Sequence, residues 1–229
     1  MSLLSGRVSK APRFWSNREL RRYAKLFRGD VVNVSGWRDE DKEGGRYRDY
    51  FTGATSYSIT NYKAEARGLQ GTPGEIFLDL EQPLVSDLAG RFDVVFNHTV
   101  LEHVYECRVA FANLCKMSRD IVIVVVPFLQ PYHSDYGDFW RFTPLALQRM
   151  YAENNFALLT CSFNEQWVTS VYMFAIGARH PERWTEHFQE EFSLTSPRTG
   201  KFAGEHAIFK VSSQLRTQLQ SLLRIPRKR

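Results

Sequence analysis

Residues 92–104 read FDVVFNHTVLEHV, and they join a strand pattern directly to a helix pattern. Residues 92–96 are rich in Phe and Val, which predicts a β-strand. Thr99 and Glu102 have the spacing of a capping box, in which each side chain bonds a backbone N–H of the other residue, and this predicts the start of a helix. The apolar residues that follow at helical spacing are Leu101, Val104, Phe111 and Cys115.

The same alternation of strand and helix continues on both sides. Residues 121–126, IVIVVV, are apolar throughout, as expected of a central parallel strand buried on both faces. Helix patterns begin at Ser16, which has Glu19 at capping-box spacing, and at Thr143, where Pro144 suits a first turn. Further strand patterns cover residues 31–34, 56–62, 75–80, 156–163 and 168–176. The sequence predicts one doubly wound α/β domain, with a mostly parallel sheet and helices on both faces.

Composition supports a folded domain. The chain has 229 residues, of which 43% are hydrophobic and 14% aromatic, enough for a substantial core. The three cysteines form no C-x-x-C pair, so we expect neither a disulfide framework nor a zinc site, and a cytoplasmic location. The longest apolar run, 121–129, is interrupted by Pro127 and falls short of the roughly 20 residues of a membrane span.

The charged residues leave two interpretations. The formal charge is +5, with basic residues concentrated near residues 18–25 and at the C-terminus. Such clusters attract nucleic acid or anionic lipid, but a solvated helix face and tail explain them more simply, so nucleic acid is not the favoured partner. We expect an N-terminal arm at 1–15, the α/β domain at 16–178 and an extension at 179–229. The extension carries an amphipathic helix from about residue 205, which packs on its own domain or on a second copy in a homodimer, or binds a membrane surface.

A doubly wound sheet also predicts where a ligand binds. Ligands occupy the crevice beyond the carboxyl ends of the strands, where the strand order reverses. The segment 127–141 follows the central strand and belongs to the same region. The other candidates directly after predicted strands are Ser35, Gly36, Trp37, Asn61, Asp79, Leu80, Asn97 and His98.

Four stretches together resemble class I S-adenosylmethionine-dependent methyltransferases, particularly the type-11-like group that acts on small molecules and glycans. FDVVFNHTVLEHV looks like the fourth strand and following helix of that family, and LDLEQPL at 78–84 is similar to its third-strand motif. VVVPFLQPYHSDYGDFWRFTP at 124–144 looks like the fifth strand and substrate-side loop, and Asn155-Phe156 sits where the family turns into its sixth strand. The resemblance covers roughly 16–178. It implies a seven-stranded sheet with the last strand antiparallel, and methyl transfer from S-adenosylmethionine.

Carried over residue by residue, the resemblance implies a set of cofactor contacts. Asp79 and Leu80 would bind the adenine, and Asn61 the ribose hydroxyls. Asn97 would contact the methionine end or the sulfonium region through its backbone, and His98 would line the crevice.

The segment Ser35-Gly36-Trp37 falls on the family's glycine-rich turn, but departs from its pattern. The family prefers glycines at Ser35 and Trp37, and acidic residues at Asn33 and Asn61. An amide forms hydrogen bonds without the help of a charge, so the site should bind the methyl donor more weakly than usual, in a rearranged way or not at all.

The segment 127–141 supplies the candidates for substrate binding. His133 is the candidate proton acceptor, since imidazole titrates near neutral pH. Tyr132, Asp138, Trp140 and Arg141 are candidate substrate contacts; alternatively Asp138 and Arg141 pair with each other and the aromatic residues belong to the core.

Glu102 and His103 have simpler explanations. Glu102 is explained as the capping partner of Thr99, and His103 as a solvated side chain. The spacing of His, Asp and Cys predicts no metal site. The leading functional hypothesis is O-methylation of a small molecule or glycan. The alternatives are an inactive binding or scaffold protein and an RNA-interacting methyltransferase.

Overall fold

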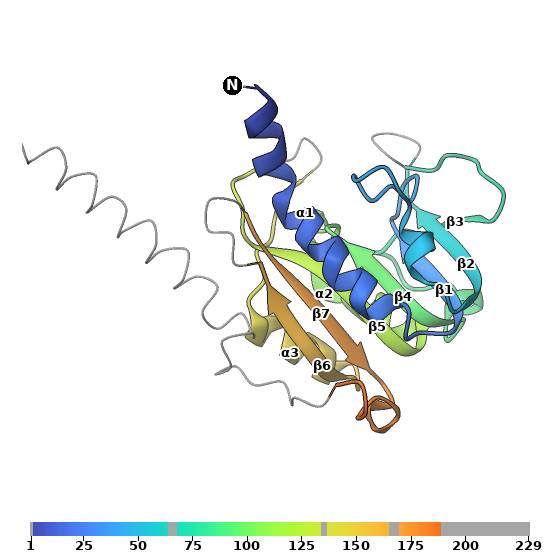
Figure 1. The fold of residues 1–229 in the computed structure, drawn as a ribbon. Helices are drawn as coiled ribbons and strands as arrows, with labels where there is room; N and C mark the ends of the chain where they lie inside the picture. Colours follow the sequence, from blue (N-terminus) through green and yellow to red (C-terminus); the bar gives the residue numbers. More distant parts are fainter. Residues whose placement is uncertain (1, 64–67, 134–136, 165–169, 189–229) are drawn as a thin grey trace, which may run out of the picture.

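The structure is a computed structural model that describes residues 2–63, 68–133, 137–164 and 170–188. Among these residues, seven strands form one sheet in the order β3-β2-β1-β4-β5-β7-β6 (Figure 1). The strands are β1 (Gly29–Val34), β2 (Ala54–Asn61), β3 (Glu75–Phe77), β4 (Phe92–His98), β5 (Ser118–Leu129), β6 (Ala157–Phe163) and β7 (Val171–Ala178). The α-helices are α1 (Ser2–Ala24), α2 (Cys107–Met117) and α3 (Pro144–Glu153). None of the described helices is long and apolar enough to cross a lipid bilayer.

The strand directions confirm the predicted fold. β1 pairs in parallel with β2 and β4, and the β2–β3 and β4–β5 pairs are also parallel. β7 is antiparallel to both of its neighbours, β5 and β6, and lies between them. The order along the sheet reverses between β1 and β4, so the predicted ligand crevice belongs beyond these two strands.

Helices cover both faces of the sheet, as predicted (Figure 1). Alternate residues of β5 point to opposite sides: Ile121 and Ile123 join one hydrophobic cluster, and Val122 and Val124 join the other. α1 contributes Leu20 and Ala24 to the first cluster. α2 and α3 contribute Phe111, Leu114, Leu147 and Tyr151 to the second. Residues 121–126 are buried by both layers, which explains why the segment is apolar throughout.

Helix α1 begins earlier than its sequence pattern indicates. The capping box expected at Ser16 is wrong, because the helix already runs from Ser2 and includes Pro12. The Ser16 hydroxyl donates to the carbonyl of Arg13 one turn back, at 3.0 Å, instead of capping a helix start. Trp15 is buried in the cluster under α1, which favours continuation of the helix through this point. α1 is thus continuous across the predicted boundary between arm and domain.

The connection from β1 to β2 contains no α-helix. Its only helical element in the described chain is a 3-10 helix at Tyr47–Tyr50. Tyr47 and Phe51 fill the space over the sheet beside α1 and join the same hydrophobic cluster. The polar residues Asp39 and Asp41 are also buried in this connection, so the loop is held by internal hydrogen bonds.

The helix predicted from Thr99 starts later than expected. Residues Leu101–His103 form a 3-10 turn, and α2 begins only at Cys107. Thr99 has a left-handed φ of 51° and its N–H donates to Val125 O at 2.7 Å, which extends the pairing of β4 with β5 and prevents a helical start. By contrast, α3 begins as predicted: Thr143 Oγ1 accepts the N–H of Ala146 at 3.1 Å, and Pro144 is in the first turn. The amphipathic helix expected from about residue 205 lies outside the described residues.

Candidate functional site

A cleft of about 840 Å³ lies beyond the carboxyl ends of β1, β2 and β4. It brings together most of the residues selected from the sequence: Ser35, Gly36, Trp37, Asn61, Asp79, Leu80, His98 and His133. It is also lined by residues that sequence reasoning missed or explained otherwise, chiefly Arg13, Tyr47, Glu102, His103, Gln130 and Tyr172. Asn97, Tyr132, Asp138, Trp140 and Arg141 are not among the lining residues.

The turn after β1 has a glycine-type backbone although two of its three residues are not glycine. Ser35 and Trp37 have φ values of 56° and 50°, in the left-handed region that costs side-chain-bearing residues energy. The turn is held by its neighbour β2, because the Ser35 N–H donates to Thr60 Oγ1 and the Gly36 N–H to Thr60 O, both at 3.2 Å. A Cβ on Gly36 would lie 2.6 Å from the side chain of Asn33, so glycine is required there.

The Asn61 side chain forms hydrogen bonds with the backbone of this turn. Its Oδ1 accepts the Trp37 N–H at 2.8 Å, and its Nδ2 donates to the Trp37 carbonyl at 3.0 Å and to Glu75 Oε1 at 2.6 Å. The side chain expected to bind ribose hydroxyls is therefore committed to protein partners. The Trp37 ring contacts the cationic groups of Lys42 and Arg38. Trp37 forms part of the wall of the cleft and does not fill it.

The amide at Asn33 is matched by a carboxylate nearby. Asn33 Nδ2 donates to Asp39 Oδ1 at 2.8 Å, and both side chains are buried. Asp39 also accepts the Tyr57 hydroxyl at 2.7 Å and the Arg48 N–H at 3.0 Å. A second carboxylate at position 33 would repel Asp39, so an amide is the compatible partner.

Helix α1 supplies one wall of the cleft. Arg13 donates through Nη2 to Thr99 Oγ1 at 2.8 Å, and Ser16 Oγ lies 2.8 Å from His98 Nε2. Burial and the nearby Arg13 charge hold the pKa of His98 well below its usual value of 6.5, so the imidazole is neutral. No sequence pattern points to Arg13, since its place in the cleft depends on how α1 packs across the sheet.

The opposite end of the cleft is formed by the segment after β3. Asp79 is half-buried and its Oδ1 accepts the Glu81 N–H at 3.0 Å. The Leu80 side chain is buried, and its carbonyl accepts Asn113 Nδ2 from α2 at 3.0 Å, which fixes the segment. Asn97 is fully buried and donates through Nδ2 to Val34 O at 3.0 Å, so its side chain joins β4 to β1.

Glu102 is the least expected residue in the cleft. The capping role predicted for it is wrong: its side chain is fully buried, and neither carboxylate oxygen has a hydrogen-bond partner among the described residues. Burial raises its pKa to about 8. His103 Nε2 lies 3.8 Å from Glu102 Oε1, and burial lowers the pKa of His103 below its usual value of 6.5. Sequence patterns cannot reveal such a group, because the spacing Thr99 to Glu102 also fits a cap.

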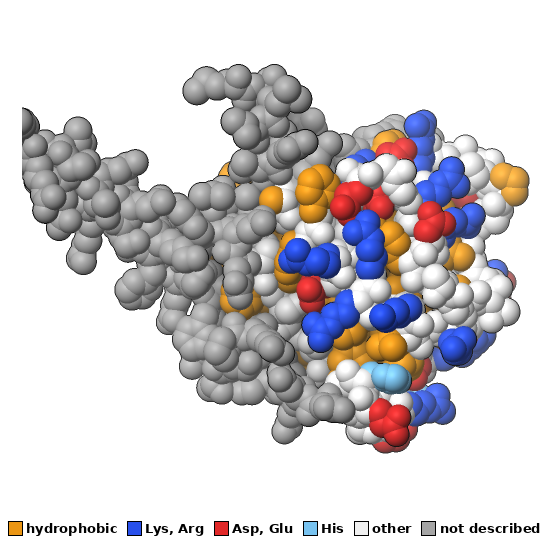
Figure 2. Space-filling model, in the orientation of Figure 1, with side chains coloured by type: hydrophobic (Ala, Val, Ile, Leu, Met, Phe, Trp, Pro, Cys, Tyr) orange, Lys and Arg blue, Asp and Glu red, His pale blue; other side chains and the backbone are white. Residues whose placement is uncertain are grey.

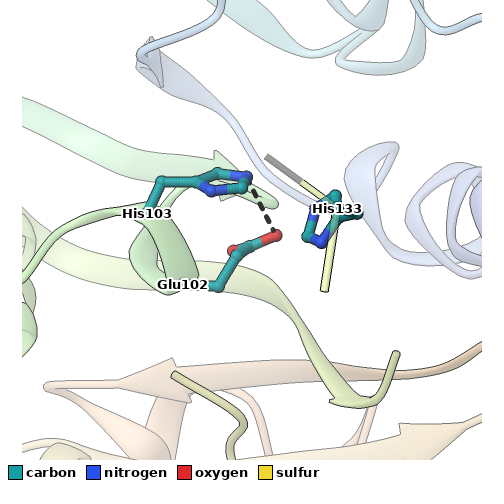
Figure 3. A group of neighbouring side chains, drawn as sticks. All are labelled: Glu102, His103 and His133. Carbon is teal, nitrogen blue, oxygen red and sulfur yellow. Dashed lines mark ion pairs between the residues drawn. The ribbon is translucent and has the colours of Figure 1, made fainter. Parts of the chain in front are cut away.

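His103 and His133 meet beside Glu102 (Figure 3). Contrary to expectation, the His103 side chain is not solvated. It is 11% exposed, and its Nδ1 lies 2.5 Å from Gly137 O. One ligand atom from each of Glu102, His103 and His133 lies within 4.8 Å of the other two. The spacing of residues in the sequence does not reveal this group, because His133 reaches it from a different loop.

In the described part of the loop 127–141, charged residues pair with one another. Both oxygens of Asp138 accept hydrogen bonds from the Arg141 guanidinium, and Oδ2 also accepts the His133 N–H at 3.1 Å. The hydrogen bonds from Arg141 lower the pKa of Asp138 to about 2. The alternative that Asp138 and Arg141 pair is confirmed. The aromatic residues are not in the core, since Phe139 is 50% exposed, Trp140 39% and Tyr132 78%.

The fold is found in solved methyltransferases. A candidate methyltransferase of Bacillus halodurans is 10% identical, over 71% of this chain and 98% of its own, with a TM-score of 0.53. The Synechocystis magnesium protoporphyrin IX methyltransferase with bound S-adenosylhomocysteine is 11% identical, over 78% and 88% of the chains, with a TM-score of 0.50. The Burkholderia thailandensis 1,6-didemethyltoxoflavin-N1-methyltransferase, bound to 1,6-didemethyltoxoflavin and S-adenosylhomocysteine, is 12% identical over 74% and 78%, with a TM-score of 0.50. No family profile and no curated protein matches this sequence. The chain has the class I S-adenosylmethionine-dependent methyltransferase fold.

Proposed function

We propose that this chain is a methyltransferase that uses S-adenosylmethionine to methylate an oxygen of a small molecule or glycan. The observation that carries the proposal is the cleft itself. It lies at the point where strand order reverses, and all the residues that the sequence assigns to the donor except Asn97 line it. The volume of about 840 Å³ is ample for a nucleoside with an amino-acid side chain and leaves room for an acceptor.

The residues present fit this cofactor at both of its ends. Asp79 and the backbone at Leu80 would hold the adenine, whose amino group suits a carboxylate. The Arg13 guanidinium suits the carboxylate of the methionine end, and the turn at Gly36 brings main chain to the same wall. When bound, the cofactor supplies an electrophilic methyl group on a sulfonium sulfur. The protein would contribute orientation and exclusion of water.

One observation favours a second function, an inactive binding or scaffold protein. The Asn61 side chain is already bonded to the backbone of Trp37 and to Glu75, so the ribose would lack the grip that the family provides. The two functions predict different results with the same ligand. An enzyme binds the donor and its product, whereas a scaffold that has lost the site binds neither.

Isothermal titration with S-adenosylhomocysteine tests the proposal. We expect saturable binding at one site, weakened at least fivefold by Arg13→Gln. Arg18→Gln is the matched control, since Arg18 is exposed on the same helix outside the cleft and its loss should leave affinity unchanged. Absence of binding at millimolar ligand would contradict the proposal and support the scaffold. Transfer of a radiolabelled methyl group to phenol, polyol and glycan acceptors then identifies the substrate class.

Among the described residues, the face that α1 covers gives no comparable support to a nucleic-acid partner. On the face that α1 covers, Figure 2 shows acidic and hydrophobic side chains between the basic ones. Arg21, one of the early arginines, pairs with Glu43 at 2.8 Å. This mixture is typical of a solvated helix face.

A further inference from the structure

We propose that Glu102, His103 and His133 bind one divalent transition-metal ion at the end of the cleft formed by the turn after β4 and the loop after β5. Two imidazoles and one carboxylate are a ligand set that suits Zn²⁺, Fe²⁺ or Co²⁺ better than Mg²⁺, which prefers oxygen ligands. The three side chains come from two loops and converge on one point (Figure 3).

The buried carboxylate is the first argument for an ion. The Glu102 side chain is fully buried, yet neither of its oxygens has a hydrogen-bond partner in the described chain. A buried carboxyl group without partners carries a cost that proteins normally avoid by pairing or by metal coordination. A cation placed between Glu102 and the two imidazoles would satisfy it.

The hydrogen bonds of the two histidines are the second argument. His103 Nδ1 faces Gly137 O, and His133 Nδ1 lies 3.1 Å from Asp138 Oδ2. When Nδ1–H donates to such an acceptor, the lone pair of the ring resides on Nε2, and this is the usual arrangement of metal-binding histidines. In His103 that nitrogen is the one 3.8 Å from Glu102. Asp138 and Gly137 thus orient both rings.

The charges around the site are compatible with an ion. Arg13, Arg141 and Asp138 are the charged neighbours that act on Glu102. Arg141 is neutralised by Asp138 through two hydrogen bonds. The ligand atoms lie within 4.8 Å of one another, against about 3.4 Å in a tetrahedral site, so binding would draw the side chains together by about 1 Å. His133, the most exposed of the three at 31%, provides access from solvent.

A consequence for catalysis rests on the function proposed above. With three protein ligands the ion would keep a coordination position open, and a hydroxyl bound to it would lose its proton to water at lower pH than a hydroxyl in solution. His133 would then act as a metal ligand and not as the proton acceptor.

Titration of untagged, chelator-treated full-length protein with Co²⁺ tests the site through the visible absorption of the bound ion. We expect one Co²⁺ per chain, displaced by Zn²⁺ and not by excess Mg²⁺. Glu102→Gln and His133→Ala should each weaken Co²⁺ binding at least tenfold. His180→Ala is the matched control: His180 also lies near a carboxylate, 3.6 Å from Glu182, but at the surface, and its loss should leave binding unchanged.

Lack of 1:1 binding, or equal binding by Glu102→Gln and His133→Ala, would overturn the site. Circular dichroism identifies a variant that fails to fold, and two variants in different loops keep the test decisive. The measurement uses no methyl donor, so its failure leaves the proposed function standing. Conversely, Co²⁺ binding by a protein that does not bind S-adenosylhomocysteine would retain the metal site and reject the methyltransferase.

Discussion

Asn33 stands where the methyltransferases that this sequence resembles prefer an acidic residue, and Asp39 supplies a carboxylate to the same buried network. Their 2.8 Å hydrogen bond shows that the sequence departure at position 33 belongs to a local arrangement with its own charge balance. From sequence alone only the departure is visible. The compensating residue lies in an irregular loop, where no periodic pattern places side chains.

We therefore expect Asn33→Asp to destabilise the protein, because it sets two buried carboxylates against each other. The free energy of unfolding at neutral pH should fall by about 2–4 kcal/mol, as measured by urea denaturation. The double variant Asn33→Asp with Asp39→Asn should recover part of the loss, since it restores one amide and one carboxylate. A single variant as stable as the wild type would disprove the charge argument.

His98 makes stability depend on pH. Its pKa in the folded protein is well below 6.5, whereas in the unfolded chain it is near 6.5, so below that pH only the unfolded state gains the proton. Stability should then decrease as pH falls, by up to about 1.4 kcal/mol per pH unit. Urea unfolding between about pH 7.5 and about pH 5.5 should show a shallower dependence for His98→Gln. The exposed His187 is the control, and His187→Gln should retain the wild-type slope.

At the scale of elements, the turn after β1 keeps a glycine-like backbone with residues that disfavour it. Ser35 has a φ of 56°. Ser35→Gly should raise the free energy of unfolding by about 0.5–1 kcal/mol, because glycine adopts this conformation without steric cost. Ser35→Ala, which retains the Cβ, should give no gain in the same thermal or urea melts. Equal effects of glycine and alanine would show that the backbone there is not strained.

The elements themselves were largely predictable. Periodic apolar residues locate β4, β5 and α3, because burial on a regular element leaves a regular trace in sequence. The strand pattern at 75–80 is longer than β3, which ends at Phe77. Leu78 and Leu80 are apolar because they are buried, although the segment that carries them is irregular. The starts of α1 and α2 were misplaced because capping patterns occur by chance, and tertiary contacts at Trp15 and Thr99 override them.

For the molecule as a whole, the part of α1 from Trp15 to Ala24 packs against the sheet in one hydrophobic cluster. Trp15 lies within the arm predicted at 1–15 but is only 8% exposed. Trp15→Ala should lower the free energy of unfolding by about 3–5 kcal/mol, since it opens a cavity under α1. Trp140→Ala is the comparison, because this side chain is largely at the surface. If both variants unfold at the wild-type urea concentration, residues 1–15 are a separable arm.

The fold and most of the cleft followed from the sequence, but the side chains that α1 and the loops after β4 and β5 add to the cleft did not. The carboxyl ends of parallel strands lie at one edge of the sheet. Residues that follow them, such as Gly36 and Asp79, could therefore be predicted from the sequence to lie close together. Arg13 and the group formed by Glu102, His103 and His133 depend on how a helix and two loops pack against that rim. Such contacts join distant segments and leave no spacing to detect.

Strand β7 is made last among the described strands, yet it lies inside the sheet between β5 and β6. A nascent chain that has emerged as far as Phe163 contains β6 but not β7, the one described strand with which β6 pairs. The sheet edge at β5 therefore stays exposed on the ribosome until Ala178 is outside the exit tunnel. A cell that makes this protein must keep that unpaired edge from aggregating until β7 is available.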